Sequence, residues 1–366
     1  MRICVICLEF GGGMIHYASQ LANSLSKNNE VYMITSECIE DTRYFEKNVN
    51  VLCVPMPPKN RNSLKWFRID IITGMLRDIK PDVIHITNHN PLLIPISFYL
   101  RRYPIVFTCH DTRRHPGDTF YFLYPYVFSL SLWVMMRLAD KIIVHGKELK
   151  EQMINENVSG SKIEVIPHGD YSFFTRYGKD GVKEENAVLF FGRIVRYKGI
   201  EYLIRAEPLI TEEFPNVKVV IAGRGDFSEY ECLIEHKKNF EIINEYIPDE
   251  KVAELFQKSR IVVVPYIEAS QSGIIPIAYA FKKPVVVTDV GSIPEVVDNK
   301  ITGLIVPPKD PKALADAIIR LLKDEKTRKK MGENGYDKMK EELTWDKIAE
   351  KTIKVYQNII RDKLCG

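Results

Sequence analysis

Hydroxyl residues and a glycine follow a buried-looking strand in the stretch IVVVPYIEASQSGIIPIAYAFKKPVVV, residues 261–287. The charge-free, β-branched run 261–264 is typical of a strand buried on both faces, and an apolar helix and a second apolar strand come after it. Ser270, Ser272 and Gly273 stand where the helix must begin, so main-chain N–H groups there would face an anion. The spacing therefore predicts a phosphate site at the turn of a βαβ unit.

Two cations follow another predicted strand in FFGRIVRYKG, residues 190–199. Arg193 and Lys198 could stabilise negative charge on a departing group without any proton transfer. A solvated basic loop is the alternative, but it explains a Gly-Arg pair at a strand end poorly. The turn AGRGD, residues 222–226, also follows a strand, although ordinary exposed loop residues would look the same.

His110 and Asp111 come directly after the apolar run 105–109, at the end of a strand where open α/β sheets place their ligand sites. We expect a functional role for His110, with a simple turn cap as the alternative. Gly11, Gly12 and Gly13 follow the first strand and would let the backbone approach a ligand closely. They lack the spacing of the dinucleotide fingerprint, which removes the main support for NAD binding.

Length, charge and cysteine usage limit the number of domains, the kind of partner and the compartment. A chain of 366 residues suits two domains, and its net charge of +3 is too small to indicate a nucleic acid partner by itself. Cys4 and Cys7 should point to opposite faces of one strand, so core packing is favoured over a redox or metal pair. Seven cysteines in mostly apolar patterns, and no signal peptide at Met1, predict a cytoplasmic protein.

Short apolar runs alternate with amphipathic stretches along the whole chain, the pattern of parallel sheets covered by helices. We predict an α/β protein with two Rossmann-like, doubly wound domains, 1–170 and 171–345, followed by a C-terminal helix, 346–366. The boundary falls in the segment between Pro167 and Asn186. The predicted strands are 3–8, 31–35, 49–54, 83–86, 105–109, 142–145 and 163–166, then 188–191, 217–222, 240–243, 261–264, 285–288 and 304–306.

The run 119–136 carries no charge over 18 residues and is long enough to be considered as a membrane span. Pro125, three tyrosines and an α/β pattern on both flanks argue against that reading. A helix buried between the sheet and its neighbours is the favoured interpretation, and an aromatic helix resting in a membrane interface is the third.

Taken together, these motifs closely resemble the retaining glycosyltransferases of family 4. The resemblance covers nearly the whole chain and rests on GGG, HDTRRHPG, VIPHG, FFGRIVRYKG, AGRGD, EASQSG and GSIPEVV. It implies the GT-B fold, in which the two domains face each other across a cleft and the last helix packs back on the N-terminal domain. It also implies transfer of a sugar from a nucleotide diphosphate sugar to an acceptor.

The resemblance implies a role for each matched residue. His110 would contact the transferred sugar, Arg193 and Lys198 would clamp the diphosphate, and Glu268 would bind the sugar hydroxyls as the fourth catalytic residue. The donor-binding residues would be Gly12, Gly13, Gly223, Ile247, Ser272, Gly273 and Ile274.

The chain also departs from the family pattern. The second glutamate of the family falls here on Ile277 or Pro276, so ribose recognition must differ. His168 replaces the usual asparagine in VIPHG, and we assign it to the hinge rather than to catalysis. Glu295 fits the pattern too, but could equally be a charge at the start of a helix.

We expect same-face sugar transfer to a glycan or lipid-linked acceptor. The sequence has no Asp-x-Asp at a strand end, so we expect no essential metal, and no cofactor besides the nucleotide sugar as co-substrate. A UDP-N-acetylglucosamine epimerase and a noncatalytic partner subunit are the alternatives. No nucleic acid partner is expected.

A peripheral contact with an anionic membrane, at the inner face of the cell membrane, is a further expectation. It is motivated by the aromatic run 120–133 with Arg113 and Arg114, and by the basic-aromatic stretch 59–68.

Overall fold

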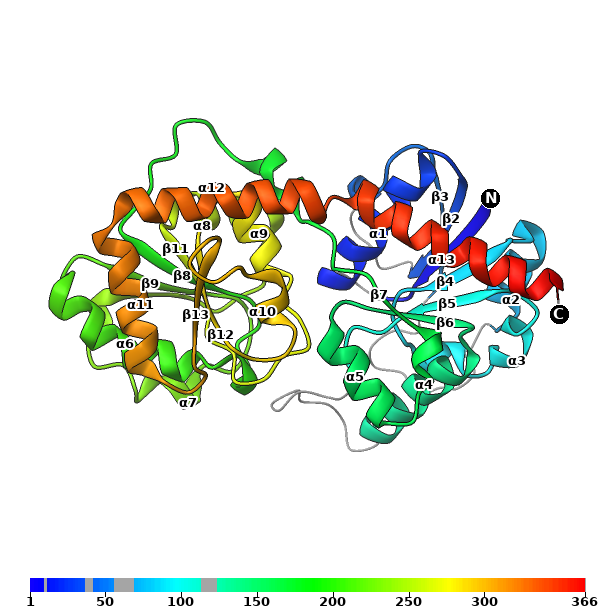
Figure 1. Cartoon of the computed structure of the whole chain (residues 1–366), viewed down its shortest axis with the longest axis horizontal. Helices are drawn as coiled ribbons and strands as arrows, with labels where there is room; N and C mark the ends of the chain where they lie inside the picture. The colour runs from blue at the N-terminus through cyan, green and yellow to red at the C-terminus, as the bar shows by residue number, and fades with distance from the viewer. Residues whose placement is uncertain (10–11, 37–41, 56–68, 113–123, 366) are drawn as a thin grey trace. The chain divides into compact units, whose positions relative to one another are not determined.

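The chain folds into two compact α/β units, each built on its own parallel sheet (Figure 1). The computed structural model describes residues 1–9, 12–36, 42–55, 69–112 and 124–365. Among these, unit 1 contains the residues up to Gly169 together with those from Trp345 onward, and unit 2 contains Asp170–Thr344. The units divide one residue before each predicted boundary, and the last helix begins at Trp345.

Unit 1 holds a seven-stranded sheet in the order β3-β2-β1-β4-β5-β6-β7. All neighbouring strands pair in parallel. The order reverses between β1 and β4, which makes the sheet doubly wound. The strands are β1 Arg2–Cys7, β2 Glu30–Ser36, β3 Val49–Val54, β4 Val83–Ile86, β5 Ile105–Thr108, β6 Lys141–Val144 and β7 Ile163–Val165.

Unit 2 repeats this plan with six parallel strands in the order β10-β9-β8-β11-β12-β13, which reverses between β8 and β11. Each of the thirteen predicted strands is present, with ends that differ by at most one residue, so the predicted fold class is confirmed. The strands are β8 Ala187–Phe191, β9 Lys218–Ala222, β10 Phe240–Ile243, β11 Ile261–Val264, β12 Val285–Thr288 and β13 Gly303–Val306.

The strands are hydrophobic on both sides because helices cover both faces of each sheet. β1 shows this at Cys4 and Cys7, which are both fully buried but in different core clusters on opposite faces. Burial raises the pKa of both thiols, that of Cys7 to about 12, so they stay protonated. Their assignment to core packing is confirmed.

The last helix, α13 (Trp345–Cys365), packs in unit 1 beside α1 (Gly13–Ser26) (Figure 1). Tyr356 of α13 is buried, and its hydroxyl lies 2.6 Å from His85 Nδ1 in β4. The Trp345 ring lies so close to Gly169 that a Cβ there would fall 2.4 Å from it. The glycine of VIPHG therefore allows the last helix to enter unit 1.

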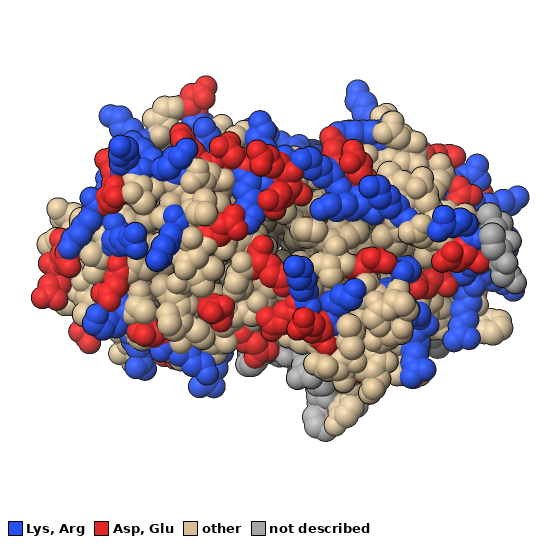
Figure 2. Space-filling view, viewed as in Figure 1, with Lys and Arg blue, Asp and Glu red and all other residues tan. Residues whose placement is uncertain are grey.

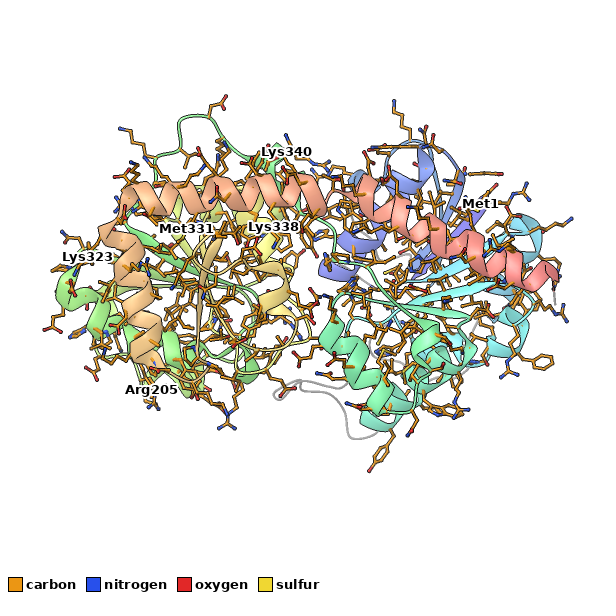
Figure 3. All side chains as sticks on the ribbon, viewed as in Figure 1. Met1, Arg205, Lys323, Met331, Lys338 and Lys340 are labelled. Atoms are coloured by element: carbon orange, nitrogen blue, oxygen red, sulfur yellow. The ribbon has the colours of Figure 1, made fainter. Side chains whose placement is uncertain are left out.

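The remaining helices cover the two sheets. In α12 (Glu325–Glu342), Met331 is buried while Lys338 forms an ion pair with Asp298 at 2.8 Å (Figure 3). Acidic and basic side chains are interspersed over the face seen in Figure 2. These helices are α2 Ile69–Ile79, α3 Ser97–Leu100, α4 Tyr124–Leu138, α5 Lys147–Asn155, α6 Ile200–Glu213, α7 Ser228–Glu231, α8 Asp249–Lys258, α9 Ile274–Ala280, α10 Ile293–Val296, α11 Pro311–Lys323 and α12 Glu325–Glu342.

Helix α4 contains most of the uncharged run, ends just beyond it with Arg137 and Leu138, and is buried on one face only. Leu132 and Met135 pack in the core, whereas Tyr126 is 73%, Leu130 49% and Trp133 52% exposed. The expectation of a helix buried all round is therefore wrong for its outer face. None of the described helices is both long and apolar enough to cross a membrane.

Candidate active site

Unit 2 carries its predicted site residues where the strand order reverses. Parallel sheets of this kind bind ligands beyond the carboxyl ends of the two strands at the reversal, here β8 and β11. The loop 192–199 follows β8, and the loop 265–273 follows β11. These loops contain Arg193, Lys198, Glu268, Ser272 and Gly273.

Lys198 and Tyr266 join the two loops across the reversal. The Lys198 ammonium donates a hydrogen bond to the Tyr266 hydroxyl at 2.6 Å and lies 4.4 Å from the centroid of that ring. Both side chains are buried, and burial raises the pKa of Tyr266 to about 12. The phenol therefore orients the ammonium without neutralising its charge.

The predicted phosphate turn is tied to the same hydroxyl. Ser272 Oγ donates to Tyr266 at 3.4 Å and accepts from the Ile274 main-chain N–H at 3.3 Å. Gly273 precedes α9 and faces the Tyr171 ring, which would lie 3.0 Å from a Cβ at that position. A phosphate that used the Ile274 N–H would have to replace Ser272 as its acceptor.

Arg193 belongs to the same pair of loops but is exposed. Its guanidinium donates to the Tyr197 hydroxyl at 3.3 Å, and the carbonyl of Tyr197 accepts from the Ile267 N–H at 2.8 Å. The structure thus brings the two predicted cations together with the loop after β11. The positive charge of Arg193 also acts on Tyr266, where it favours the ionised form of the phenol.

Two glycines let these loops pack backbone to backbone. Gly199, with φ +66°, follows Lys198, and a Cβ there would fall 1.9 Å from the Pro265 carbonyl oxygen. Gly223, with φ +148°, would place a Cβ 2.0 Å from the Gly192 carbonyl oxygen. Both positions therefore require glycine for conformation and for space.

The other predicted donor residues of unit 2 lie around this centre. Glu268 is exposed in the loop after β11, and Ile247 is buried in the loop before α8. Pro276 and Ile277 are both buried in α9. The positions that the resemblance gives to a second glutamate thus belong to the packing of α9.

Unit 1 holds the remaining predicted residues, and these also lie near its strand reversal. Gly12, with φ +75°, precedes α1 at the carboxyl end of β1 and has open space where a Cβ would be, and Gly13 is the first residue of α1. His110 follows β5 and is buried, with Nε2 3.0 Å from the Thr87 carbonyl oxygen. Gly11, Arg113, Arg114, His115 and the stretch 59–68 lie outside the described residues.

A cluster of aromatic and histidine side chains around His110 was not predicted. Tyr17 of α1 contacts the rings of His110, His145 and His168 at centroid distances of 4.9, 5.3 and 5.1 Å. Burial lowers the pKa of all three histidines, that of His168 to about 4. The signal available in the sequence is that each histidine follows a strand, at positions that parallel pairing brings to one edge of the sheet.

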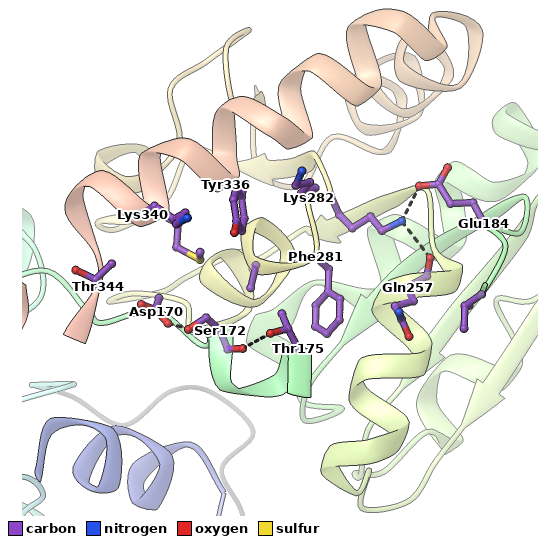
Figure 4. Close-up of a pocket in the computed structure, with 14 residues that line it drawn as sticks. Asp170, Ser172, Thr175, Glu184, Gln257, Phe281, Lys282, Tyr336, Lys340 and Thr344 are labelled. Carbon is purple, nitrogen blue, oxygen red and sulfur yellow. Dashed lines mark hydrogen bonds and ion pairs between the residues drawn. The ribbon is translucent and has the colours of Figure 1, made fainter. Parts of the chain in front are cut away.

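A cavity of about 570 Å³ elsewhere in unit 2 contains none of the predicted site residues (Figure 4). It lies at the far end of α9, where Lys282 and Lys340 flank the ring of Tyr336. Their Nζ atoms lie 5.1 and 5.3 Å from the centroid of that ring. Lys283 on its wall donates to Glu184 at 2.6 Å. The cavity is therefore separate from the loops after β8 and β11.

The part of the chain that the structure describes shows no candidate metal site. Within it, no three or more His, Cys, Asp or Glu residues are grouped so that they could hold a metal ion.

Comparison with known sequences identifies both units. Residues 11–169 match the family model described as Glycosyltransferase Family 4, and residues 176–338 match Glycosyl transferases group 1. The chain is 28% identical to an uncharacterized glycosyltransferase of Methanocaldococcus jannaschii over 98% of both chains. It is 24% identical to the phosphatidyl-myo-inositol mannosyltransferase of Mycobacterium leprae over 98% of this chain and 97% of that one.

Solved structures share the fold over nearly the whole chain. Anabaena HepE, solved in complex with UDP and glucose, is 17% identical with a TM-score of 0.76 and covers 98% of this chain and 99% of its own. A putative UDP-N-acetylglucosamine 2-epimerase from Listeria monocytogenes, 13% identical with a TM-score of 0.66, covers 98% of this chain and 96% of its own. Both family models that match the chain are glycosyltransferase families, one for each unit. The chain therefore belongs to the family 4 glycosyltransferases, and it has the GT-B fold.

Proposed function

We propose that the protein transfers a sugar from a nucleotide diphosphate sugar to a glycan or lipid-linked acceptor, with retention of configuration and without a metal. The observation that carries this proposal is the pair of cations at the strand reversal of unit 2, with Lys198 held by Tyr266 beside Ser272. Such a site suits an anionic leaving group. The nucleotide-bound relatives add support, since HepE was solved with UDP and glucose.

The reaction needs charge stabilisation more than proton transfer at the donor. As the bond from the sugar carbon to the diphosphate oxygen breaks, negative charge grows on the diphosphate, and Lys198 and Arg193 stabilise it. The acceptor oxygen attacks the same face of the sugar, and its proton moves to the departing phosphate. Glu268 binds sugar hydroxyls in this scheme, and His110 contacts the sugar from unit 1.

We assign the remaining contacts with the nucleotide sugar to residues whose places are set by the course of the backbone. Gly223 and Ile247 lie beside the nucleotide, while Ser272, Gly273 and Ile274 bind the diphosphate. Gly12 and Gly13 leave room for the sugar in unit 1, because no side chain stands at either position.

Alanine substitutions of the two cations test the proposal. Arg193→Ala and Lys198→Ala should each lower single-turnover transfer on the order of a hundredfold, since each supplies a few kcal/mol at the leaving group. Lys282→Ala is a matched control, because Lys282 also lies against a tyrosine ring but at the separate cavity. Near-normal transfer by either site variant would rule out the diphosphate clamp.

The same assay distinguishes the two rival functions. A panel of nucleotide sugars is incubated with and without acceptors, and the products are followed by mass spectrometry and NMR. An epimerase would change the nucleotide sugar in the absence of acceptor, and a noncatalytic subunit would bind nucleotide without turnover.

A peripheral membrane contact is part of the proposal, and the outer face of α4 supports it. Tyr126, Leu130 and Trp133 are spaced along one side of the helix, and the Arg137 guanidinium lies 5.3 Å from the centroid of the Trp133 ring. Phe98 on the adjacent α3 is 78% exposed. Aromatic side chains beside a cation suit the interface of an anionic bilayer, where a lipid-linked acceptor would lie.

Liposome flotation at low salt tests this contact. Wild-type protein should float with anionic vesicles, and the double variant Leu130→Ser/Trp133→Ser should stay in the soluble fraction. Leu209→Ser is the control, since Leu209 is an exposed leucine on α6 of unit 2. Wild-type protein that remains soluble would turn the search toward a soluble acceptor.

A further inference from the structure

His110 and His145 meet nitrogen to nitrogen in the core of unit 1. His110 Nδ1 lies 3.1 Å from His145 Nε2. The outer nitrogens reach main-chain carbonyls, with His110 Nε2 3.0 Å from the Thr87 oxygen and His145 Nδ1 3.0 Å from the Ile166 oxygen. All three contacts have the length of a hydrogen bond, and each is a hydrogen bond only if a proton lies between its two atoms.

Two neutral imidazoles cannot fill three such contacts. Each neutral ring carries one N–H, and a carbonyl oxygen only accepts. If both protons sit on the outer nitrogens, two lone pairs face each other at 3.1 Å. A third proton would fill every contact, but it would leave one positive charge buried in the pair.

The surroundings oppose that charge. Burial lowers the pKa of His110, and it lowers the pKa of His145 well below its ordinary value. The Asp111 carboxylate and the hydrogen bond to Thr87 favour a cation at His110, but burial outweighs both, and burial raises the pKa of Tyr17 to about 12, which keeps that phenol neutral. Among the residues that the structure describes, the titratable and charged groups facing the pair are Tyr17 from α1, His85 from β4, His89 from the next loop, Asp111 and His168.

A neutral pair therefore leaves one of the three contacts without a proton, and a donor from outside the pair could reach it only at a carbonyl contact. The Ile166 contact lies beside Tyr17 and His168, inside the packed cluster. The Thr87 contact lies in the loop after β4, at the strand reversal where unit 1 is expected to meet its ligand. A ligand hydroxyl at that place could supply the missing donor.

We propose that His145 is a positioning residue that holds His110 as its Nδ1–H tautomer. His145 donates from Nδ1 to Ile166 and accepts at Nε2 from His110. His110 Nε2 then carries a lone pair beside the Thr87 carbonyl and accepts a hydrogen bond from a hydroxyl of the bound sugar. This assignment rests on the proposed function, in which His110 contacts the transferred sugar.

Two conservative variants separate tautomer control from simple anchoring. In His145→Gln the side-chain amide falls near the position of Nε2, so it can accept from His110 but loses the Ile166 contact. In His145→Asn the amide falls near Nδ1, so it keeps the Ile166 contact but offers His110 no acceptor. We expect Gln to retain transfer, and Asn to lose about tenfold in kcat/KM, the value of one lost hydrogen bond.

The pH profile carries a second signature. In the wild type and in His145→Gln, kcat/KM should fall as acid protonates His110 and ties Nε2–H to the Thr87 carbonyl. If His145→Asn transfers as well as the wild type while His145→Gln fails, the role of His145 is anchoring to Ile166, and the proposal is overturned.

Ring ¹⁵N shifts of labelled wild-type protein decide the tautomer without any substrate. His110 is assigned by comparison with His110→Gln, and at pH 7.5 it should show a protonated Nδ1 and an unprotonated Nε2. A protonated Nε2 would overturn the proposal whether or not the protein transfers sugar. The expected tautomer in a protein that turns over no nucleotide sugar would instead count against the proposed function alone.

Discussion

Acidification to pH 5.0 should destabilise unit 1 strongly, because it buries neutral histidines. Burial lowers the pKa of His85 to about 3 and those of His89 and His168 to about 4, from an ordinary value of 6.5. Below pH 6.5 the unfolded chain binds protons that the native state does not, so the free energy of unfolding falls as the pH falls. The stabilisation is complete above pH 6.5 and is lost progressively down to the native pKa values.

The size of the effect follows from these values. The pH of 5.0 lies about 1.5 units below the pKa of each histidine in the unfolded chain. Each histidine therefore lowers the free energy of unfolding by about 2 kcal/mol, and the three together lower it by about 6 kcal/mol. His110 and His145 act in the same direction, since burial lowers their pKa values too. Burial raises the pKa of Glu9, which acts in the opposite sense, so pH 5.0 is preferable to a lower value.

Urea unfolding at pH 7.5 and 5.0, followed by tryptophan fluorescence, measures the difference. Trp133 and Trp345 lie in unit 1, so the signal reports the unit that holds the histidines. His168→Gln should remove about 2 kcal/mol of the pH dependence, while His236→Gln, in unit 2, controls for the loss of a histidine as such. Equal unfolding free energies at the two pH values, within about 1 kcal/mol, would refute the reasoning.

Two further predictions concern the loops of unit 2. Single-turnover transfer should persist in excess EDTA because Lys198 and Arg193 supply the positive charge, and chemistry that stops on chelation and returns with manganese would show a metal requirement. Gly199→Ala should lower the free energy of unfolding by at least about 2 kcal/mol, owing to its positive φ and its contact with the Pro265 carbonyl. Gly74→Ala in α2, where a Cβ meets nothing, should instead stabilise by about 1 kcal/mol, and equal effects of the two would contradict the steric argument.

Much of the fold was predictable because buried parallel strands have a local signature. An uncharged β-branched run such as 261–264 must be covered on both faces, whichever elements cover it. Candidate site residues were predictable for a related reason. Lys198, His110 and Ser272 follow such runs, and the carboxyl ends of parallel strands share one edge of the sheet.

The partners of those residues depend on strand order, which no local pattern contains. Tyr266 lies 68 residues from Lys198 and meets it because β8 and β11 are neighbours in the sheet. The outer face of α4 is another such case, since its uncharged sequence does not reveal which side the core leaves uncovered.

Local patterns specify the two sheets, the turns at their edges and the residue types available there. That His145 faces His110, and that Tyr356 reaches the ring of His85 from 271 residues along the chain, follows from packing instead. The difference arises because hydrophobic periodicity is a property of a few consecutive residues. Hydrogen bonding between buried side chains is instead a property of the packed whole, because each polar group must find its partner among the residues that folding brings beside it.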